Sequence, residues 1–175
     1  TRVRLDKTSP ERHELYLEHG RMHARVIAPP RLFAVGTPSA HVTDLGCEYT
    51  LEIDETGAGS ITVQTGRVEL DTGKGVLVQV PAGARAKLLP GRRASLPVGD
   101  TAAPQLVAAV DEYDRGMAGA IERILELATP AHAITVAHLA KLAPSAKKRA
   151  VLERLMELFP APRGMTVDEA LADDA

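Results

Sequence analysis

Hydrophobic and polar residues alternate with a period of two through most of residues 1–100. The clearest run is CEYTLEID at 47–54, in which the odd positions are apolar and the even positions are polar. This period is typical of a β-strand with one buried face, because successive side chains of a strand point to opposite sides. The polar positions indicate that each sheet has one solvated face, as antiparallel sheets do.

Several such runs follow one another, separated by turns that contain glycine. The runs are 14–17, 22–27, 47–54, 61–64, 68–70, 76–80 and 84–88. Residues 47–54 and 61–64 flank the turn-forming segment 56–60, which predicts a hairpin, and the first two runs flank a predicted turn at His19 and Gly20. Short strands at this spacing predict an all-β sandwich or roll.

After about residue 100 the apolar residues recur at helical spacing. Asp100 and Thr101 precede Pro104, which predicts a capped helix start with proline in its first turn. One stripe then runs to the residues before Pro130, and a second short helix is expected at 135–142. The stripe consists of Leu106, Val110, Tyr113, Met117, Ile121, Ile124 and Ala128.

A third helix is expected to start at Ser145 as its N-cap. Its predicted buried stripe is Leu152, Leu155, Met156 and Phe159. The sequence TVDE at 166–169 has the form of a capping box and predicts a last short helix. Strands followed by helices predict a segregated α+β fold, with a jelly-roll-like sandwich or short β-roll at 1–100 and an α-helical region at 101–175.

The composition narrows the range of functions. The 175 residues carry 21 Lys and Arg against 23 Asp and Glu, a net charge of −2, which does not favour binding to nucleic acid or to an anionic membrane. Aromatic residues make up 3% with no Trp, so a base-stacking platform or an aromatic sugar-binding face is hard to build. No run approaches the roughly 18 apolar residues that a membrane-spanning helix needs.

Ser39, His41 and Asp44 are the residue types of a hydrolytic triad. On one strand, however, Ser39 and His41 point to the same face in line, and the imidazole does not approach the hydroxyl as activation requires. The sequence also has no G-x-S-x-G elbow. We therefore interpret these three residues as turn and strand residues.

The histidines do not form a recognisable metal motif. A cupin-type enzyme requires an H-x-H pair followed by Glu, and the sequence has no such pair. A zinc site of His13, His19 and His23 is the alternative, but exposed turn histidines are commoner than ligands. His132 and His138 are six residues apart and would not share a helical face. We expect neither a metal nor another cofactor.

Cys47 is the single cysteine, so an internal disulfide and multi-cysteine metal sites are excluded. It shares the apolar face of its strand with Tyr49 and Leu51, and we interpret it as a small buried hydrophobe rather than a reactive thiol. The segments 57–59 and 73–75 are glycine-containing hairpin turns. Neither leads from a strand into a helix, so neither is a phosphate-binding loop.

Arg85, Lys87, Arg92 and Arg93 form a local basic cluster. One interpretation is a solvated edge that discourages strand pairing with other molecules. The sharper alternative is a docking patch for an acidic partner protein. These four residues are the candidate partner-binding surface of the chain.

Residues 33–54, FAVGTPSAHVTDLGCEYTLEID, resemble the core motif of the FecR family, F-x-V-x-T-P-x-A-x-x-x-D-L-G-T-x-F/Y-x-V-x-V. Residues 15–24 are similar to its L-x-L-x-x-G-x-L/V-x-A hairpin, and residues 61–70 to its V-x-V-x-x-G-x-V-x-L/V strand pair. Residues 80–86 resemble its closing L-x-A-G-E segment. Order and spacing agree, so the resemblance covers about residues 12–95.

FecR proteins are membrane-anchored bacterial regulators, and their FecR domain lies outside the cytoplasmic membrane. The resemblance implies a small β-roll or jelly-roll-like domain that acts in signalling by protein contact, without catalysis. In the family the signal crosses the membrane to a short N-terminal segment that controls an extracytoplasmic-function sigma factor. The expected location is therefore the periplasmic face of the inner membrane. We expect the chain to be an excised or processed part, anchored by a segment upstream of Thr1.

The chain departs from the family at two points. Cys47 stands where the family usually has Thr, and the region after Pro104 differs from the βαβ-type domain of transporter-coupled members. A role in iron uptake is therefore not carried over. Asp44, Gly46 and Gly66 match the motif, and we interpret them as turn and bulge residues.

Three functions from different classes remain. The first is a regulatory ectodomain that binds a partner protein through sheet edges or the helical region. The second is a module that binds a cell-envelope ligand or polysaccharide. The least favoured is a metal-dependent jelly-roll enzyme, for which the sequence offers neither a triad nor a metal motif.

Overall fold

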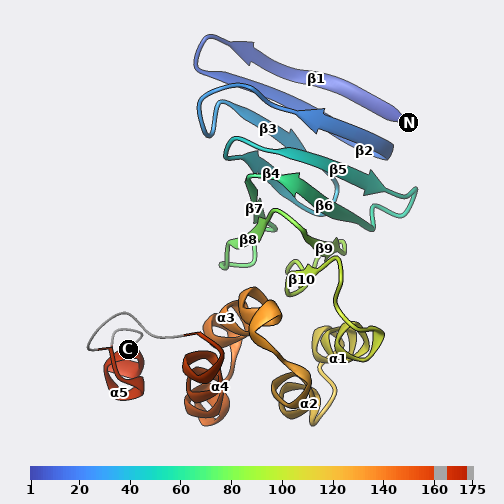
Figure 1. The fold of residues 1–175 in the computed structure, drawn as a ribbon. Helices are drawn as coiled ribbons and strands as arrows, with labels where there is room; N and C mark the ends of the chain where they lie inside the picture. The colour runs from blue at the N-terminus through green and yellow to red at the C-terminus, as the bar shows by residue number, and fades with distance from the viewer. Residues whose placement is uncertain (160–164, 173–175) are drawn as a thin grey trace. The chain divides into compact units, whose positions relative to one another are not determined.

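The computed structural model describes residues 1–159 and 165–172. They belong to two compact units, Thr1–Asp100 and Thr101–Ala175. The first unit is built of strands and the second of helices (Figure 1). The predicted fold class, a β-rich N-terminal part followed by a helical C-terminal part, is confirmed.

The strands of the first unit form one curled ten-stranded sheet, in the order β10-β9-β6-β5-β2-β3-β4-β7-β8, with β1 also paired to β2. Their bounds are β1 (Arg2–Ser9), β2 (Arg12–Arg25), β3 (Phe33–Gly36), β4 (His41–Asp44), β5 (Glu48–Ile53), β6 (Gly59–Thr65), β7 (Arg67–Asp71), β8 (Val78–Pro81), β9 (Ala84–Leu88) and β10 (Val98–Gly99). Apart from the parallel pair β2–β3, all neighbours are antiparallel. The expected hairpins β5–β6 and β7–β8 are both present.

Strand β2 belongs to both halves of the sheet. Its first half pairs with β1 and β3, and its second half pairs with β5. The predicted turn at His19 and Gly20 is wrong, because the strand continues through both residues. Gly20 has φ +109°, and a Cβ there would lie 2.4 Å from the Cα of Thr1. Glycine thus allows a local distortion inside the strand rather than a chain reversal.

One apolar core lies between the two halves of the sheet. Side chains from both halves are in this cluster, which shows that the sheet curls over and closes on itself. The half containing β5, β6 and β9 contributes Tyr49, Leu51, Ile53, Ile61, Val63, Ala84, Ala86 and Leu88, and the other half contributes Leu17, Val35, Val42, Val68, Leu70, Val78 and Val80. The odd positions of 47–54 are buried as predicted.

Gly66 is the corner at which the chain passes from β6 to β7. Its φ is +70°, and a Cβ there would lie 2.0 Å from the carbonyl oxygen of Gly46. The corner requires both the left-handed conformation and the missing side chain. This is a physical reason for the glycine at this position of the FecR-like motif.

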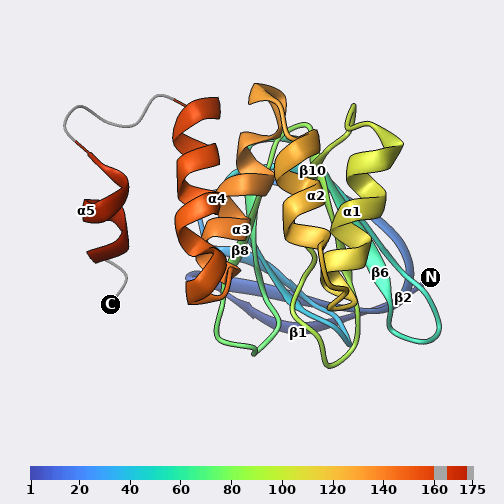
Figure 2. The ribbon, with the colours of Figure 1, turned by 90° about the horizontal axis from the view of Figure 1, so that it is seen from below.

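The helical unit contains α1 (Pro104–Asp114), α2 (Ala120–Leu127), the short 3₁₀ helix η1 (Pro130–His132), α3 (Ala133–Leu142), α4 (Ser145–Leu158) and α5 (Val167–Ala172). Helix α1 packs on α2 and α3 packs on α4 (Figure 2). Among the described helices, none combines the length and the apolar character needed to cross a bilayer.

The predicted continuous stripe from Leu106 to Ala128 is wrong, because the chain breaks between α1 and α2. Gly116 and Gly119 both adopt positive φ in this break, and Met117 between them is 51% exposed. Glycines in the left-handed conformation end a helix whatever the apolar spacing around them. The remaining apolar positions pack from two separate helices.

The predicted helix starts are only in part correct. The N-cap of α1 is Ala103 and that of α4 is Pro144, so Asp100, Thr101 and Ser145 are not caps. Helix α1 begins with Pro104, whose fixed φ suits the first helical turn, and Pro144 is the residue directly before α4.

Two further helix predictions have opposite outcomes. Phe159, expected in the buried stripe of α4, is 53% exposed, whereas Val151 and Leu158 are buried. The capping box at 166–169 is confirmed, because Glu169 and Thr166 exchange side-chain to backbone hydrogen bonds of 2.7 and 3.2 Å.

Candidate functional site

The outer face of the sheet half formed by β2, β5, β6 and β9 is polar throughout. We call it the polar face. Its outward side chains are Arg21, His23, Arg25, Glu48, Thr50, Glu52, Ser60, Thr62, Gln64, Arg85 and Lys87. The residues between them on the same strands point into the core, so strand periodicity alone places these polar groups together.

Strand pairing arranges the polar face in rows that run across the strands. In one row Arg21 lies opposite Glu52, Glu52 opposite Ser60, and Ser60 opposite Lys87. Arg21 Nε is 3.2 Å from Glu52 Oε1. The row thus contains an ion pair at the β2 side and a lysine beside a serine at the β9 side.

In the next row His23 lies opposite Thr50, Thr50 opposite Thr62, and Thr62 opposite Arg85. The hydroxyl of Thr50 lies 3.2 Å from His23 Nδ1 and accepts a hydrogen bond of 3.3 Å from Gln64 Nε2. Thr50 is therefore held from two sides. Two threonines directly opposite each other are a favourable cross-strand pair.

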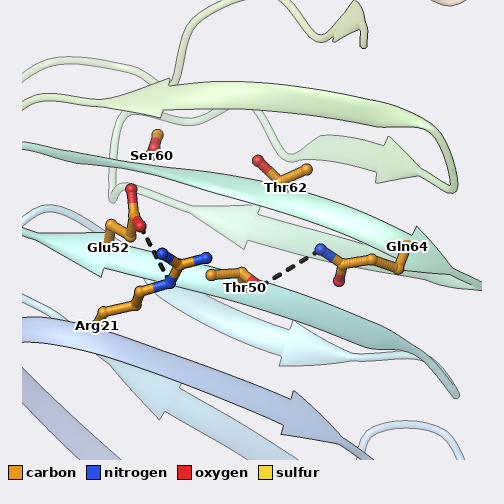
Figure 3. A pocket seen from close by; sticks show the side chains of 6 residues that line it. All are labelled: Arg21, Thr50, Glu52, Ser60, Thr62 and Gln64. Atoms are coloured by element: carbon orange, nitrogen blue, oxygen red, sulfur yellow. Dashed lines mark hydrogen bonds and ion pairs between the residues drawn. The ribbon is translucent and has the colours of Figure 1, made fainter.

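These rows enclose a shallow trough of about 240 Å³ (Figure 3). Its floor is made of the short side chains of Thr50, Ser60 and Thr62, while Arg21 and Glu52 rise at one side. Gln64 lines one end of it. A second shallow depression of about 440 Å³ adjoins the trough and shares Arg21, Glu52 and Ser60 with it. The trough presents hydroxyl, amide, guanidinium and carboxylate groups, and so it can both donate and accept hydrogen bonds.

The structure divides the basic cluster that the sequence singles out. Arg85 and Lys87 are exposed on β9 and border the trough on the side away from Arg21. Arg92 and Arg93 lie in the segment after β9, where the Arg93 guanidinium donates a hydrogen bond of 3.1 Å to the carbonyl of Ala94. Two of the four residues thus belong to the polar face, and their role in partner binding remains a prediction.

The three triad-type residues have separate partners. The hydroxyl of Ser39 donates to the carbonyl oxygen of Gly57, and His41 Nε2 lies 3.3 Å from a carboxylate oxygen of Glu14. The carboxylate of Asp44 accepts a hydrogen bond of 2.7 Å from the backbone N–H of Gly46. The interpretation of these residues as turn and strand residues agrees with these contacts.

Cys47 is buried, and its thiol donates to the carboxylate of Asp44. Burial raises the pKa of the Cys47 thiol, and the hydrogen bond and negative charge of Asp44 raise it further. Such a group stays a neutral thiol, which is the opposite of a reactive cysteine. Tyr49 is next in the core, and burial raises the pKa of its phenol as well.

The side chains of His13, His23 and His138 have separate surroundings. His13 Nδ1 lies within hydrogen-bond distance of the Thr8 hydroxyl, at 2.7 Å, and His23 Nε2 lies 3.0 Å from Glu48 Oε1. His138 is buried in α3, and desolvation lowers its pKa. Within residues 1–159 and 165–172, no group of three or more His, Cys, Asp and Glu side chains is arranged to hold a metal ion.

The polar residues of the FecR-like motif form turns. Thr37 Oγ1 donates to the carbonyl of Ala40 at 2.9 Å and accepts the N–H of Ala40 at 2.9 Å. Asp44 accepts the N–H of Gly46 in the same manner. These residues shape the scaffold and lie outside the polar face. Sequence reasoning missed the trough residues Thr50, Ser60, Thr62 and Gln64, because they followed the same alternation as any solvated strand face.

No protein-family model matches the chain. No curated protein matches it at a significant level. Two crystal structures, each described as that of a candidate anti-sigma factor from Parabacteroides distasonis, are similar to it. Both are 20% identical, with TM-scores of 0.47 and 0.45. They cover 61% and 59% of this chain, which spans 50% and 47% of theirs. The chain therefore spans about half the length of the chains in those structures, and a likeness at this level does not carry their role over to it.

Proposed function

We propose that the chain is the extracytoplasmic regulatory part of a membrane-anchored protein of FecR type. It controls sigma-factor-dependent transcription across the membrane through protein–protein contacts and without catalysis. The observation that supports contact with a protein is the polar face, which carries a shallow trough lined by polar side chains. The resemblance to FecR supports the sigma-factor pathway and the location outside the cytoplasmic membrane.

The open and polar form of the trough favours a protein partner over a small molecule. Small-molecule sites are enclosed, mostly apolar cavities of roughly 300 to 1,000 Å³. The trough of about 240 Å³ and the adjoining depression of about 440 Å³ are both shallow and lie on the open face of a sheet, and the trough is lined by polar side chains. A surface of this form supplies little enclosure, and it suits a partner that brings its own extended surface.

The contacts of the nucleophile-type side chains support a non-catalytic role. The Ser39 hydroxyl donates a hydrogen bond to a backbone carbonyl, and Cys47 is a buried neutral thiol beside Asp44. Nucleophilic catalysis needs an adjacent base and access to substrate. Here both groups stabilise corners of the β unit.

Binding of a cell-envelope polysaccharide is the second candidate. It is favoured by the hydroxyl, amide and guanidinium groups of the trough, which match the hydrogen-bonding groups of a sugar. The polar face has no aromatic side chain among its residues, and sugar rings usually rest on aromatic rings. We therefore place protein binding first.

The test is an in-frame deletion of residues 1–175 from the full-length protein in its native host. We expect a coherent set of transcripts with a shared promoter element to change in abundance, measured by RNA sequencing. Reintroduction of the full-length protein should restore the set. An unchanged transcript profile would show that the regulatory proposal is wrong.

The location is tested separately. An epitope placed in the β7–β8 turn, at residues 72–75, should be cleaved when protease is added to intact spheroplasts. A cytoplasmic marker protein should survive in the same sample. Survival of the epitope until the cells are lysed would contradict the extracytoplasmic location.

A further inference from the structure

We infer that two copies of this chain associate through β1, which pairs antiparallel with β1 of the second copy around a two-fold axis at Arg4. The association goes beyond the proposed function and does not depend on it. Three features of β1 support it: an open strand edge, apolar side chains at that edge, and charges that complement themselves when two copies meet.

Strand β1 lies at the margin of the sheet (Figure 1). Among residues 1–159 and 165–172, only β2 pairs with it. Residues 2–8 of β1 are exposed, and Ser9 at its end is half-buried. One edge of β1 therefore faces solvent, and an edge of this kind is a template for pairing with another strand.

The open edge presents the main-chain groups of Val3 and Leu5. His13 of β2 donates its N–H to the residue before β3. Tyr16, three residues further along β2, directs its N–H and C=O to the other side, where it lies opposite Arg4. Arg4 therefore points its main chain at β2. Because successive residues of a strand point to opposite edges, the N–H and C=O groups of Val3 and Leu5 point away from β2.

The same two residues carry exposed apolar side chains. Val3 lies opposite Leu17 and Leu5 opposite Leu15, so both lie on the face of the sheet that carries the core. Their side chains are nevertheless 42% and 62% exposed. In an antiparallel pair centred on Arg4, Val3 of each copy lies opposite Leu5 of the other. The four apolar side chains then contact one another and lose part of their exposure to water.

This register uses the open main-chain groups fully. Val3 of one copy and Leu5 of the other form a pair that exchanges two N–H···O=C bonds, and the two-fold axis repeats it. Beyond Leu5 the register with β2 shifts, which leaves Asp6 as an extra residue before Lys7. A bulge of this kind ends regular pairing on an edge strand. The contact is therefore confined to residues 2–6 of each copy and closes as a dimer.

The charges of β1 fit the same register. Arg2 of one copy lies opposite Asp6 of the other, so opposite charges face each other. Within each copy Arg2 is 3.1 Å from Glu18 and Arg4 is 2.5 Å from Asp6, so the two segments meet without net charge from these residues. The Arg4 guanidinium also lies 4.3 Å from the ring centre of Tyr16. It thus leans toward β2 and away from the two-fold axis.

A strand from a different protein could also add to this edge. The second copy is the better match, because residues 2–6 themselves supply the apolar side chains and the opposite charges that the register needs.

The first test is the oligomeric state of the intact chain of 175 residues, measured by sedimentation velocity over a range of concentrations. The paired segment is short, so we expect a weak dimer with a dissociation constant on the order of 100 μM. Leu5→Pro removes an N–H that points to solvent and keeps the pairing with β2, so it should weaken the dimer by at least about tenfold. Leu5→Lys keeps the N–H and places a charge among the apolar side chains, and it should weaken the dimer by at least about tenfold as well.

Thr8→Pro is the matched control. Thr8 lies opposite His13, whose main chain points to β3, so the N–H of Thr8 points to the same open edge as that of Leu5. It lies beyond residues 2–6, and its replacement should leave the dissociation constant within about twofold of the original value. Circular dichroism checks that each variant is folded.

The second test measures the register. In a Cys47→Thr background, Arg4→Cys should form a disulfide between two copies on mild oxidation, because the Cα atoms of opposite residues in a pair without hydrogen bonds are about 4.5 Å apart. Val3→Cys in the same background is the control. It lies diagonally from its own symmetry mate and should cross-link at least about tenfold more slowly. Non-reducing electrophoresis measures both rates.

A chain that stays monomeric up to about 1 mM would overturn the inference. A dimer that survives both Leu5 variants, or that Thr8→Pro weakens equally, would do the same. Faster cross-linking of Val3→Cys than of Arg4→Cys would contradict the axis at Arg4. Addition of a strand from another protein to β1, in a chain that does not self-associate, would assign the edge to that protein instead.

Discussion

The two units of the chain are stabilised in different ways. In the β unit, strands distant in sequence close around one core, and its corners depend on glycine and on buried polar pairs such as Asp44 with Cys47. In the helical unit, neighbouring helices pack in pairs, and polar side chains link helices, such as Arg154 of α4 with the end of α2 and Arg123 of α2 with Glu112 of α1. Non-local closure makes single corner positions critical for stability, whereas a series of local helix pairs depends on the contacts at helix ends.

The largest effect is expected at the corner between β6 and β7. Gly66→Ala should lower the free energy of unfolding of the β unit by about 3 kcal/mol or more, because the new Cβ meets a backbone oxygen at a positive φ. Gly73→Ala is the control, since it also has a positive φ, of +68°, but open space around it, and it should cost about 1 kcal/mol. Urea unfolding monitored by amide hydrogen exchange reports each unit separately. Equal costs for the two variants would show that the corner is not critical.

The second largest loss of stability is expected in the helical unit, on substitution of Arg154. The Arg154 guanidinium donates to the carbonyls of Leu125 and Ala128, at 3.1 and 2.6 Å, at the C-terminal end of α2. Arg154→Met should destabilise this unit by about 2 kcal/mol, because charged hydrogen bonds to carbonyls at a helix end are lost. Arg149→Met, which removes an exposed ion pair with Asp168, should leave the unit unchanged. Loss of helical circular dichroism on heating measures both variants.

Two substitutions of Cys47, which is paired with Asp44 in the core, are expected to change the stability of the β unit in opposite directions. Cys47→Thr replaces a weak thiol donor by a hydroxyl and should stabilise the β unit by up to about 1 kcal/mol. Cys47→Val removes the donor, leaves a buried carboxylate oxygen without it, and should cost about 2 kcal/mol. The difference between the two variants isolates the hydrogen bond, because their side chains have nearly the same shape. A valine variant as stable as the threonine variant would contradict it.

The smallest effect is the pH dependence of the helical unit. His138 is buried and its pKa is lowered in the folded state, so the unfolded state binds a proton more readily. Its contribution is fully present above pH 6.5, the ordinary pKa of histidine, and is lost as the pH falls below that value. The melting temperature of the helices should therefore drop between pH 7.5 and 5.5 more in the original chain than in His138→Asn. Identical shifts in the two proteins would show that His138 does not couple to pH.

The local pattern of apolar and polar residues was sufficient to predict the strands that bury one face against the core. The run 47–54 alternates because Tyr49, Leu51 and Ile53 face the closed interior. Strand β1 was not predicted, because its two apolar residues, Val3 and Leu5, remain 42% and 62% exposed and only pairing with β2 defines it. Apolar alternation detects burial and does not detect pairing.

The trough could not be predicted for a related reason. Thr50, Thr62 and Arg85 lie in one row only because β6 pairs with β5 on one side and β9 on the other. That pairing is non-local, and the alternation of each strand by itself is the same whichever strand lies beside it. The basic pair on β9 was identified from its composition, whereas its hydroxyl neighbours required the register.

The continuity of β2 has a consequence for how the gene can change. Because one strand serves both halves of the sheet, adding or deleting a residue between Arg12 and Arg25 shifts the pairing of one half against the other. A shift of one residue turns inward side chains outward, so the Leu17 end or the Ala24 end of the strand would lose its place in the core. Insertions in the turns at 55–57 or 72–75 disturb no such shared register. Length variation among natural relatives should therefore accumulate in those turns and be absent from β2.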